Sequence, residues 1–182
     1  VKLVERLATE PTLSTDTWHR LQNEFENANR VLIAVGQLPP ASALWAVLKE
    51  FSEEMGVPVL GDIISNVPVN ESFVRQHDVF LRGKNEELLT TLQPDLLITV
   101  GDSFISKNFK LFLRNYSPAR HWHVKTTEQL IDTFQTLTTQ IPVEPLYFFQ
   151  NLLEELDYQQ FVKNDSDDVG RWDFREAWLK AD

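Results

Sequence analysis

One lysine stands where its type and position could do chemistry. The segment Asp95–Leu113, DLLITVGDSFISKNFKLFL, reads as a buried strand, a Gly-Asp turn and a helix. Lys107 falls near the expected N-terminus of that helix, where a positive side chain opposes the macrodipole. Backbone N–H groups at a helix N-terminus also attract anions. The pattern predicts a carboxylate or phosphate site, although an exposed lysine without a role fits the composition equally well.

The charges around this lysine are unusual for the chain. The net charge is −10, yet no acidic residue occurs between Asp102 and Glu128. We expect this interval to form a local positive feature, because all its charged residues are basic: Lys107, Lys110, Arg114, Arg120 and Lys125.

Other polar residues favour structural roles. Asp62 and Asp102 each follow a glycine at the end of an apolar run, and we expect them, with Ser103, to cap the next element. Their spacing predicts no acid/base pair. His121 and His123 alternate on a predicted strand and so share one face. A metal pair is conceivable there, but a structural role is favoured because no third ligand lies nearby in sequence.

Nucleotide motifs are missing. The first apolar run is followed by Gly36-Gln37-Leu38-Pro39-Pro40, which has one glycine where a dinucleotide fingerprint needs three. No Walker A motif or nucleophile elbow occurs. Tight nucleotide binding is therefore not favoured by the residues.

Apolar runs alternate with helical patterns along the chain. We predict a doubly wound α/β fold with a mostly parallel, six-stranded Rossmann-like sheet in the order 3-2-1-4-5-6. The expected strands are residues 30–36, 57–62, 78–81, 95–101, 121–124 and 136–141. The expected helices cover 15–28, Pro39 or Pro40 to Met55, 85–92, a stretch presenting Phe109 to Tyr116, and a stretch from Pro145 to Leu156.

Composition bounds the class of protein. The chain has 182 residues with 42% hydrophobic content, enough for one domain with a real core. Its negative charge argues against nucleic acid and membrane surfaces as partners. Without cysteine there is no disulfide or thiolate metal site. We expect a cytoplasmic protein, since no membrane span or signal peptide is apparent.

The ends of the chain differ from its centre. Residues 1–14 read as a linker, 15–156 as a central α/β domain, and 157–182 as an acidic linker with a short helix toward a missing catalytic domain. Trp172, Phe174 and Trp178 indicate that this last segment packs down, or else faces that missing domain. The chain starts with Val1, and its single methionine is Met55, so we expect a piece of a longer protein.

Three segments carry a resemblance to a known family. VPVLGDIISN, then DLLITVGDSFISKNFKLFL and HWHV resemble the middle domain of 2-succinyl-5-enolpyruvyl-6-hydroxy-3-cyclohexene-1-carboxylate synthase (MenD), the thiamine-diphosphate-dependent enzyme of menaquinone biosynthesis. The resemblance covers Arg30 to Leu156. It implies a central domain between N- and C-terminal domains that bind thiamine diphosphate and magnesium across a dimer interface. This chain lacks their GDG motif, so the resemblance implies no cofactor, metal or catalytic residue here and an inactive fragment of a homo-oligomeric enzyme.

The resemblance also implies a substrate-binding role for a few residues. The complete enzyme would decarboxylate 2-oxoglutarate and join the product to isochorismate, and both substrates are polyanions. The family's lysine at the helix start matches Lys107, flanked here by Ser106 and by Asn108 in place of a second basic residue. Gln37 stands where some relatives have arginine. As an alternative, the domain would bind a nucleotide such as FAD or ADP at the switch-point crevice, and a third reading is a spacer that only orients the outer domains.

Overall fold

A six-stranded parallel sheet forms the centre of the computed structural model, which describes residues 11–127, 129–156 and 168–182. The order is β3-β2-β1-β4-β5-β6, as predicted. Every pairing within the sheet is parallel. The strands are β1 (Val31–Val35), β2 (Val59–Gly61), β3 (Phe73–Val74), β4 (Leu96–Val100), β5 (Arg120–Val124) and β6 (Thr139–Ile141).

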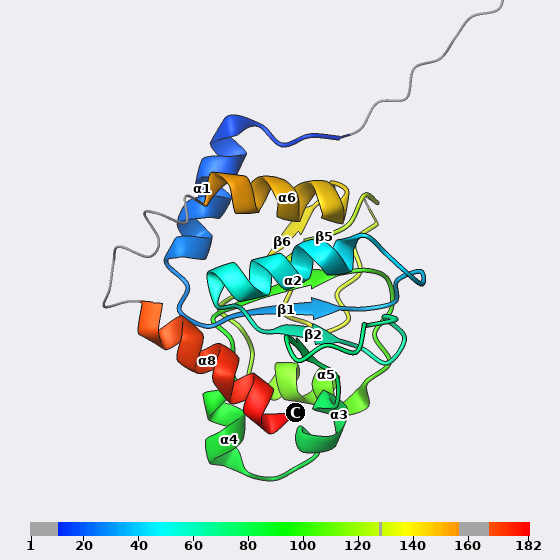
Figure 1. Cartoon of the computed structure of the whole chain (residues 1–182), viewed down its shortest axis with the longest axis vertical. Coiled ribbons are helices and arrows are strands. Elements are labelled where there is room, and N and C mark those ends of the chain that lie inside the picture. Colours follow the sequence, from blue (N-terminus) through cyan, green and yellow to red (C-terminus); the bar gives the residue numbers. More distant parts are fainter. Residues whose placement is uncertain (1–10, 128, 157–167) are drawn as a thin grey trace, which may run out of the picture.

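Helices cover both faces of the sheet (Figure 1). On one face lie α1 (Thr15–Glu26), α2 (Leu44–Met55) and α6 (Pro145–Glu155). On the other lie α3 (His77–Phe80), α4 (Glu86–Thr91), α5 (Lys107–Asn115) and α8 (Asp168–Ala181). All five residues of β1 and of β4 are buried, because helices shield both sides of these central strands.

Two expectations about the elements were wrong. Residues 78–81 form no strand, because His77–Phe80 is one helical turn, and the third strand is Phe73–Val74. The helix expected to begin at Pro39 or Pro40 begins at Leu44 instead. A turn at Ala41, whose φ is +55°, separates the prolines from α2.

The last helix packs against the domain. Phe174 and Trp178 of α8 are buried in the apolar cluster that α5 and the sheet share, whereas Trp172 is 39% exposed. Arg171 donates to the carbonyls of Phe25 and Ala28 at 3.1 and 2.7 Å. The expectation that this segment packs down is therefore confirmed for the helix. Residues 1–10 of the linker expected at 1–14, and residues 157–167 of the segment expected at 157–182, lie outside the described residues.

Among the helices that the structure describes, none is long and apolar enough to cross a membrane.

Candidate functional site at the carboxyl edge of the sheet

Lys107 is the first residue of α5, as the sequence predicted for a helix start after β4. The N-cap is Ser106, whose hydroxyl oxygen accepts from the amide of Phe109 at 3.2 Å. The Lys107 side chain is exposed, and within the described part of the chain no ion pair or hydrogen bond joins its ammonium group. The cation is therefore presented to solvent at the carboxyl edge of the sheet.

Two carboxylates from other elements hold the turn that carries Lys107. Buried Asp62, which follows β2, accepts from the amides of Ile105 and Ser106 at 2.9 and 3.1 Å. Asp78 of α3 accepts from the Ser106 hydroxyl and from the Asn108 amide. The Ser106 hydrogen bond is the main cause of the lowered pKa of Asp78. Both carboxylates also offset the helix macrodipole, so no free anion is needed to explain α5.

The side chains of Asn108 and Ser106 are engaged in hydrogen bonds within the fold, which suits a structural role better than ligand binding. The Asn108 side-chain amide donates to the backbone carbonyl and to the carboxylate of Asp78, at 2.8 and 3.1 Å. The Ser106 hydroxyl is engaged by Asp78 and Phe109. These contacts tie α5 to α3 and leave Lys107 as the unpaired member of the predicted trio.

His77 lies beneath this turn. It is 2% exposed, and neither ring nitrogen has a hydrogen-bond partner among the described residues. Its ring packs edge-on against Phe109 at 5.4 Å between centroids. Burial lowers the pKa of His77, against the opposing influence of Asp62, Asp78 and Asp182, so a neutral imidazole fits this apolar position.

The loops after β1 and β4 are joined by their backbones. The Gln37 amide donates to the Ser103 carbonyl at 2.9 Å, and the Asp102 amide donates back to the Gln37 carbonyl at 3.0 Å. Glycines allow this approach, because a Cβ on Gly36 would lie 2.8 Å from the Asp102 carbonyl oxygen. The amides are already paired, so they are not free to cradle a diphosphate at the switch point.

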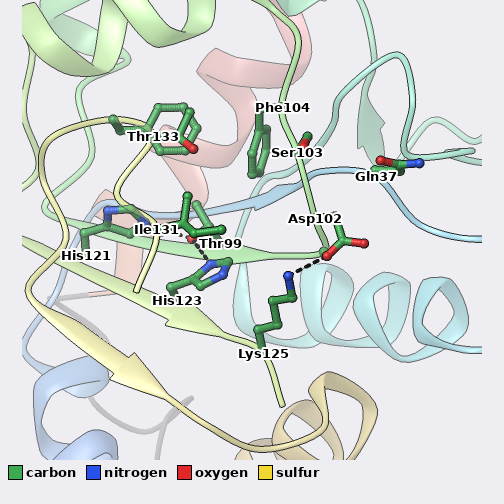
Figure 2. Close-up of a pocket in the computed structure, with 12 residues that line it drawn as sticks. Gln37, Thr99, Asp102, Ser103, Phe104, His121, His123, Lys125, Ile131 and Thr133 are labelled. Atoms are coloured by element: carbon green, nitrogen blue, oxygen red, sulfur yellow. Dashed lines mark hydrogen bonds and ion pairs between the residues drawn. The ribbon is translucent and has the colours of Figure 1, made fainter. Parts of the chain in front are cut away.

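Asp102 has a different role from the one expected. It does not cap α5, because that position belongs to Ser106. Its carboxylate instead pairs with the Lys125 ammonium at 2.6 Å across the ends of β4 and β5 (Figure 2). Lys125 directly follows β5, and it can reach Asp102 because neighbouring parallel strands bring their carboxyl ends to the same edge of the sheet.

A pocket of about 280 Å³ opens beside this ion pair. Phe104, Phe134 and Ile131 form its apolar wall, and Thr99, His121 and His123 its polar side. Gln37 lies across the pocket from His121 (Figure 2). Lys107, Ser106 and Asn108 are not among the lining residues, so the structure does not bring Gln37 and the predicted trio into one pocket.

The two histidines share a face of β5 and meet at one hydroxyl, as their alternation predicted. Thr99 Oγ1 lies 2.8 Å from His121 Nε2 and 2.9 Å from His123 Nδ1. Thr136 Oγ1 lies 2.9 Å from His121 Nδ1. Burial lowers the pKa of His121 to about 4 and also lowers that of His123, so both rings are neutral at pH 7.

A structural role suits this histidine pair. Among the described residues, no group of three or more His, Cys, Asp or Glu side chains could hold a metal ion. Sequence reasoning missed Thr99 and Asp78. Thr99 could have been noticed as the polar residue within the apolar run DLLITVG, whereas Asp78 has no local pattern that points to Ser106.

The basic interval does not form one patch. Arg120 lies near Glu24 at 3.9 Å, at the start of β5, whereas Lys125 lies at the opposite end. Arg114 donates to the Thr133 carbonyl at 3.1 Å. Within this interval, Lys107 and Lys110 on α5 therefore remain as the basic side chains without a partner among the described residues.

Comparisons with known proteins agree with this architecture. The solved structure of a candidate thiamin diphosphate-dependent enzyme from Mycobacterium smegmatis superimposes with a TM-score of 0.57 and 13% identity, over 86% of this chain and 31% of that one. At that identity, the likeness concerns the fold alone.

Two relatives are similar in sequence. The 2-succinyl-5-enolpyruvyl-6-hydroxy-3-cyclohexene-1-carboxylate synthase of Flavobacterium johnsoniae is 33% identical over 74% of this chain and 24% of its own length. The synthase of the same name from Desulfotalea psychrophila is 28% identical over 84% of this chain and 28% of its own. The chain thus spans about a quarter of these relatives.

The family assignment rests on most of the chain. Residues 4–160 match the family described as "Middle domain of thiamine pyrophosphate", and the synthase relatives cover much of the same stretch. The parallel sheet in the order β3-β2-β1-β4-β5-β6 agrees with that match. The chain therefore belongs to the thiamine pyrophosphate enzyme middle-domain family, as a central domain of the kind found in the menaquinone-pathway synthase.

Proposed function

We propose that this chain works as the middle domain of a longer synthase that joins decarboxylated 2-oxoglutarate to isochorismate, with Lys107 at its substrate-facing edge. The observation that carries the proposal is an exposed, unpaired ammonium held on a turn fixed by Asp62 and Asp78. Both substrates carry several negative charges, and a fixed cation would orient them and stabilise their binding.

The carbon chemistry would belong to thiamine diphosphate and magnesium bound by the N- and C-terminal domains of the same polypeptide. The described residues here offer no fitting diphosphate or metal site, since the crevice amides are paired and no ligand cluster occurs. Lys107 would act as a positioning and electrostatic group. The isolated chain would be inactive, and the complete enzyme a homo-oligomer of the cytoplasm.

The other predicted site residues receive supporting roles in this proposal. Ser106 and Asn108 would fix the backbone from which Lys107 extends, because their side chains already bind Asp78. Gln37 is exposed at the mouth of the neighbouring pocket, where its amide could contact a second part of the substrate.

Replacement of Lys107 in the longer protein tests the proposal. We expect Lys107→Ala to raise the KM for isochorismate or 2-oxoglutarate by about 10-fold or more, since one hydrogen bond to a charged group is worth roughly 1.5–3 kcal/mol. Lys107→Arg should restore part of the loss. The exposed Lys84 provides the matched control, Lys84→Ala, which should leave both KM values unchanged. Unaltered kinetics of Lys107→Ala with both substrates would refute the substrate role.

The nucleotide alternative has less support. Its phosphates would need backbone amides that are bonded between the loops after β1 and β4, and Lys125 is already paired with Asp102. Calorimetric titration of the longer protein with ADP, FAD and NAD decides the question, because micromolar binding would favour this alternative over a substrate-edge role.

A further inference from the structure

A hollow of about 280 Å³ lies at the amino edge of the sheet, at the opposite end of the strands from Lys107. It opens between the end of α4, the residue that enters β1 and the first turns of α8 (Figure 1). Its volume lies just below the roughly 300–1,000 Å³ of pockets that hold drug-sized ligands, so a small molecule would fill it. We call it the amino-edge pocket, and its lining residues are Arg30, Thr90, Thr91, Gly170, Asp173 and Phe174.

Arg30 presents a guanidinium group with spare donors to this pocket. The side chain is anchored, because its Nη1 donates to the Thr90 carbonyl at 3.3 Å. A guanidinium carries several further N–H donors, and in the part of the chain that the structure describes no carboxylate forms an ion pair with it. Arginine binds carboxylates strongly through two parallel hydrogen bonds. The pocket therefore offers an anchored cation to a carboxylate.

Asp173 supplies the opposite charge from α8. It is exposed, and its carboxylate makes no hydrogen bond or ion pair with any described residue, Arg30 included. The hydroxyls of Thr90 and Thr91 donate to carbonyls of their own helix, at 2.7 and 2.9 Å, so their oxygens are left as acceptors. An ammonium group would therefore find a carboxylate and hydroxyl oxygens in this pocket.

The two other lining residues leave room for an apolar group. Phe174 is buried, and its side chain gives the pocket an apolar floor. Gly170 lies in the first turn of α8, where a Cβ would meet no atom within 4 Å, so packing does not require a glycine there. Glycine weakens a helix relative to alanine. A wall kept free of side chains beside the pocket gives this glycine a role.

We propose that the amino-edge pocket binds a free α-amino acid as its zwitterion. The carboxylate of the ligand pairs with Arg30, its ammonium group pairs with Asp173, and its side chain lies over Phe174. A zwitterion satisfies both unpaired charges at once, whereas a dicarboxylate would be repelled by Asp173 and a simple amine by Arg30. This site goes beyond the proposed function, since it shares no residue with the carboxyl edge that carries Lys107.

Titration of the longer protein with L-leucine, followed by saturation-transfer NMR, tests the pocket. We expect saturable binding with a dissociation constant on the order of 1 mM, because ion pairs that are open to solvent are weak. Two derivatives each lack one charge: L-leucinamide has no carboxylate, and N-acetyl-L-leucine has no ammonium group. Each derivative should bind at least about 5-fold more weakly than leucine, since each loses one ion pair.

Variants that remove one charge show which side chain binds which group. Arg30→Gln should weaken leucine binding by about 5-fold and leave leucinamide binding unchanged, because leucinamide has no carboxylate to lose. Asp173→Asn should weaken leucine binding by about the same factor and leave N-acetyl-leucine binding unchanged. The matched controls are Arg82→Gln and Asp16→Asn, which remove exposed charges outside the pocket and should not alter leucine binding.

Gly170 allows a test that keeps both charges in place. Gly170→Leu should narrow the pocket and weaken leucine binding, whereas Gly170→Ala should retain it, because its Cβ would meet no atom within 4 Å. Absence of saturable leucine binding would overturn the proposal, and so would binding that is unchanged in Arg30→Gln, Asp173→Asn and Gly170→Leu. Lys107→Ala should leave leucine binding unaltered, so failure of this site and failure of the proposed function are distinguishable.

Discussion

At the scale of single residues, Asp78 decides how Lys107 is presented. Its carboxylate bonds to Ser106 and Asn108 and so joins α3 to the start of α5. We expect Asp78→Ala to lower the free energy of unfolding by about 1–2 kcal/mol, because charge-assisted hydrogen bonds at a partly exposed site would be lost. Urea unfolding of the chain measures this loss.

The exposed Glu154 gives the control for that experiment. Glu154→Ala removes a carboxylate that makes no hydrogen bond or ion pair with the described residues, and it should change the free energy of unfolding by less than about 0.5 kcal/mol. If both variants unfold at the same urea concentration, Asp78 does not fix the turn.

His121 makes the stability of the domain depend on pH. Burial lowers its pKa from 6.5 to about 4, with His123 adding to the effect and Asp132 opposing it. As the pH falls below 6.5, His121 is protonated in the unfolded chain, whereas in the folded chain it stays neutral until about pH 4. The free energy of unfolding therefore falls as the pH falls through this window. The full loss is on the order of 3 kcal/mol.

Urea unfolding at pH 7 and pH 5 measures this dependence. His77 and His123 have pKa values lowered in the same direction, so they add to the slope and only part of it belongs to His121. The variant His121→Gln, which has no titrating group, should lose less stability between the two pH values than the unaltered chain. Identical slopes would contradict the assignment.

The roles of single residues could be predicted from the sequence where they depend on neighbours close along the chain. Lys107 at a helix start and two histidines on one face followed from spacing alone. The prediction that Asp102 caps the helix was wrong, because its carboxylate pairs with Lys125, which directly follows β5. Asp78 escaped notice because its contacts join residues 28 to 30 positions apart in sequence.

At the scale of elements, the turn after β4 depends on a glycine. Gly101 has a φ of +82°, and a Cβ there would lie 2.8 Å from the Gln37 carbonyl oxygen. We expect Gly101→Ala to lower the free energy of unfolding by about 2–3 kcal/mol, because alanine is strained at this left-handed φ and its Cβ would also crowd the Gln37 carbonyl. Thermal or urea unfolding detects this change.

Gly170 is the matched control for that substitution. It lies in α8, it is exposed, and a Cβ there would meet no atom within 4 Å. Gly170→Ala should stabilise by about 0.5–1 kcal/mol, because alanine favours the helix. If the two alanine variants had equal stability, the strain assigned to the β4 turn would be wrong.

The elements themselves could be predicted where apolar runs were long. Two five-residue buried strands, β1 and β4, and their position at the centre of the sheet followed from the runs RVLIAVG and DLLITVG. The edge strand Phe73–Val74 has only two residues, too few to show a period, and the apolar pair in His77–Phe80 imitated a strand.

At the scale of the whole molecule, α8 completes the apolar cluster that α5 and the sheet share. Phe174 and Trp178 are buried against α5, while Asp182 accepts from the amides of Arg75 and Gln76 at 2.8 and 2.5 Å and so ties the end of α8 to the segment that leads into α3. The aromatic residues predicted that this segment packs down. Its sequence could not tell which face of the sheet it covers, because that choice depends on residues far away in sequence, such as Phe80 and Phe112, which contact Trp178.

Removal of residues 157–182 tests whether the folding unit ends at Leu156, the boundary predicted from sequence. We expect the truncated chain to lose well over 3 kcal/mol of stability, because loss of a single buried Trp or Phe side chain already costs about 3–5 kcal/mol. Near-ultraviolet circular dichroism and urea unfolding measure the loss. The control is Lys180→Ala in the intact chain, which breaks only the exposed pair with Glu176 and should leave the free energy of unfolding almost unchanged. A truncated chain as stable as the intact one would place the boundary at Leu156 and make α8 an accessory.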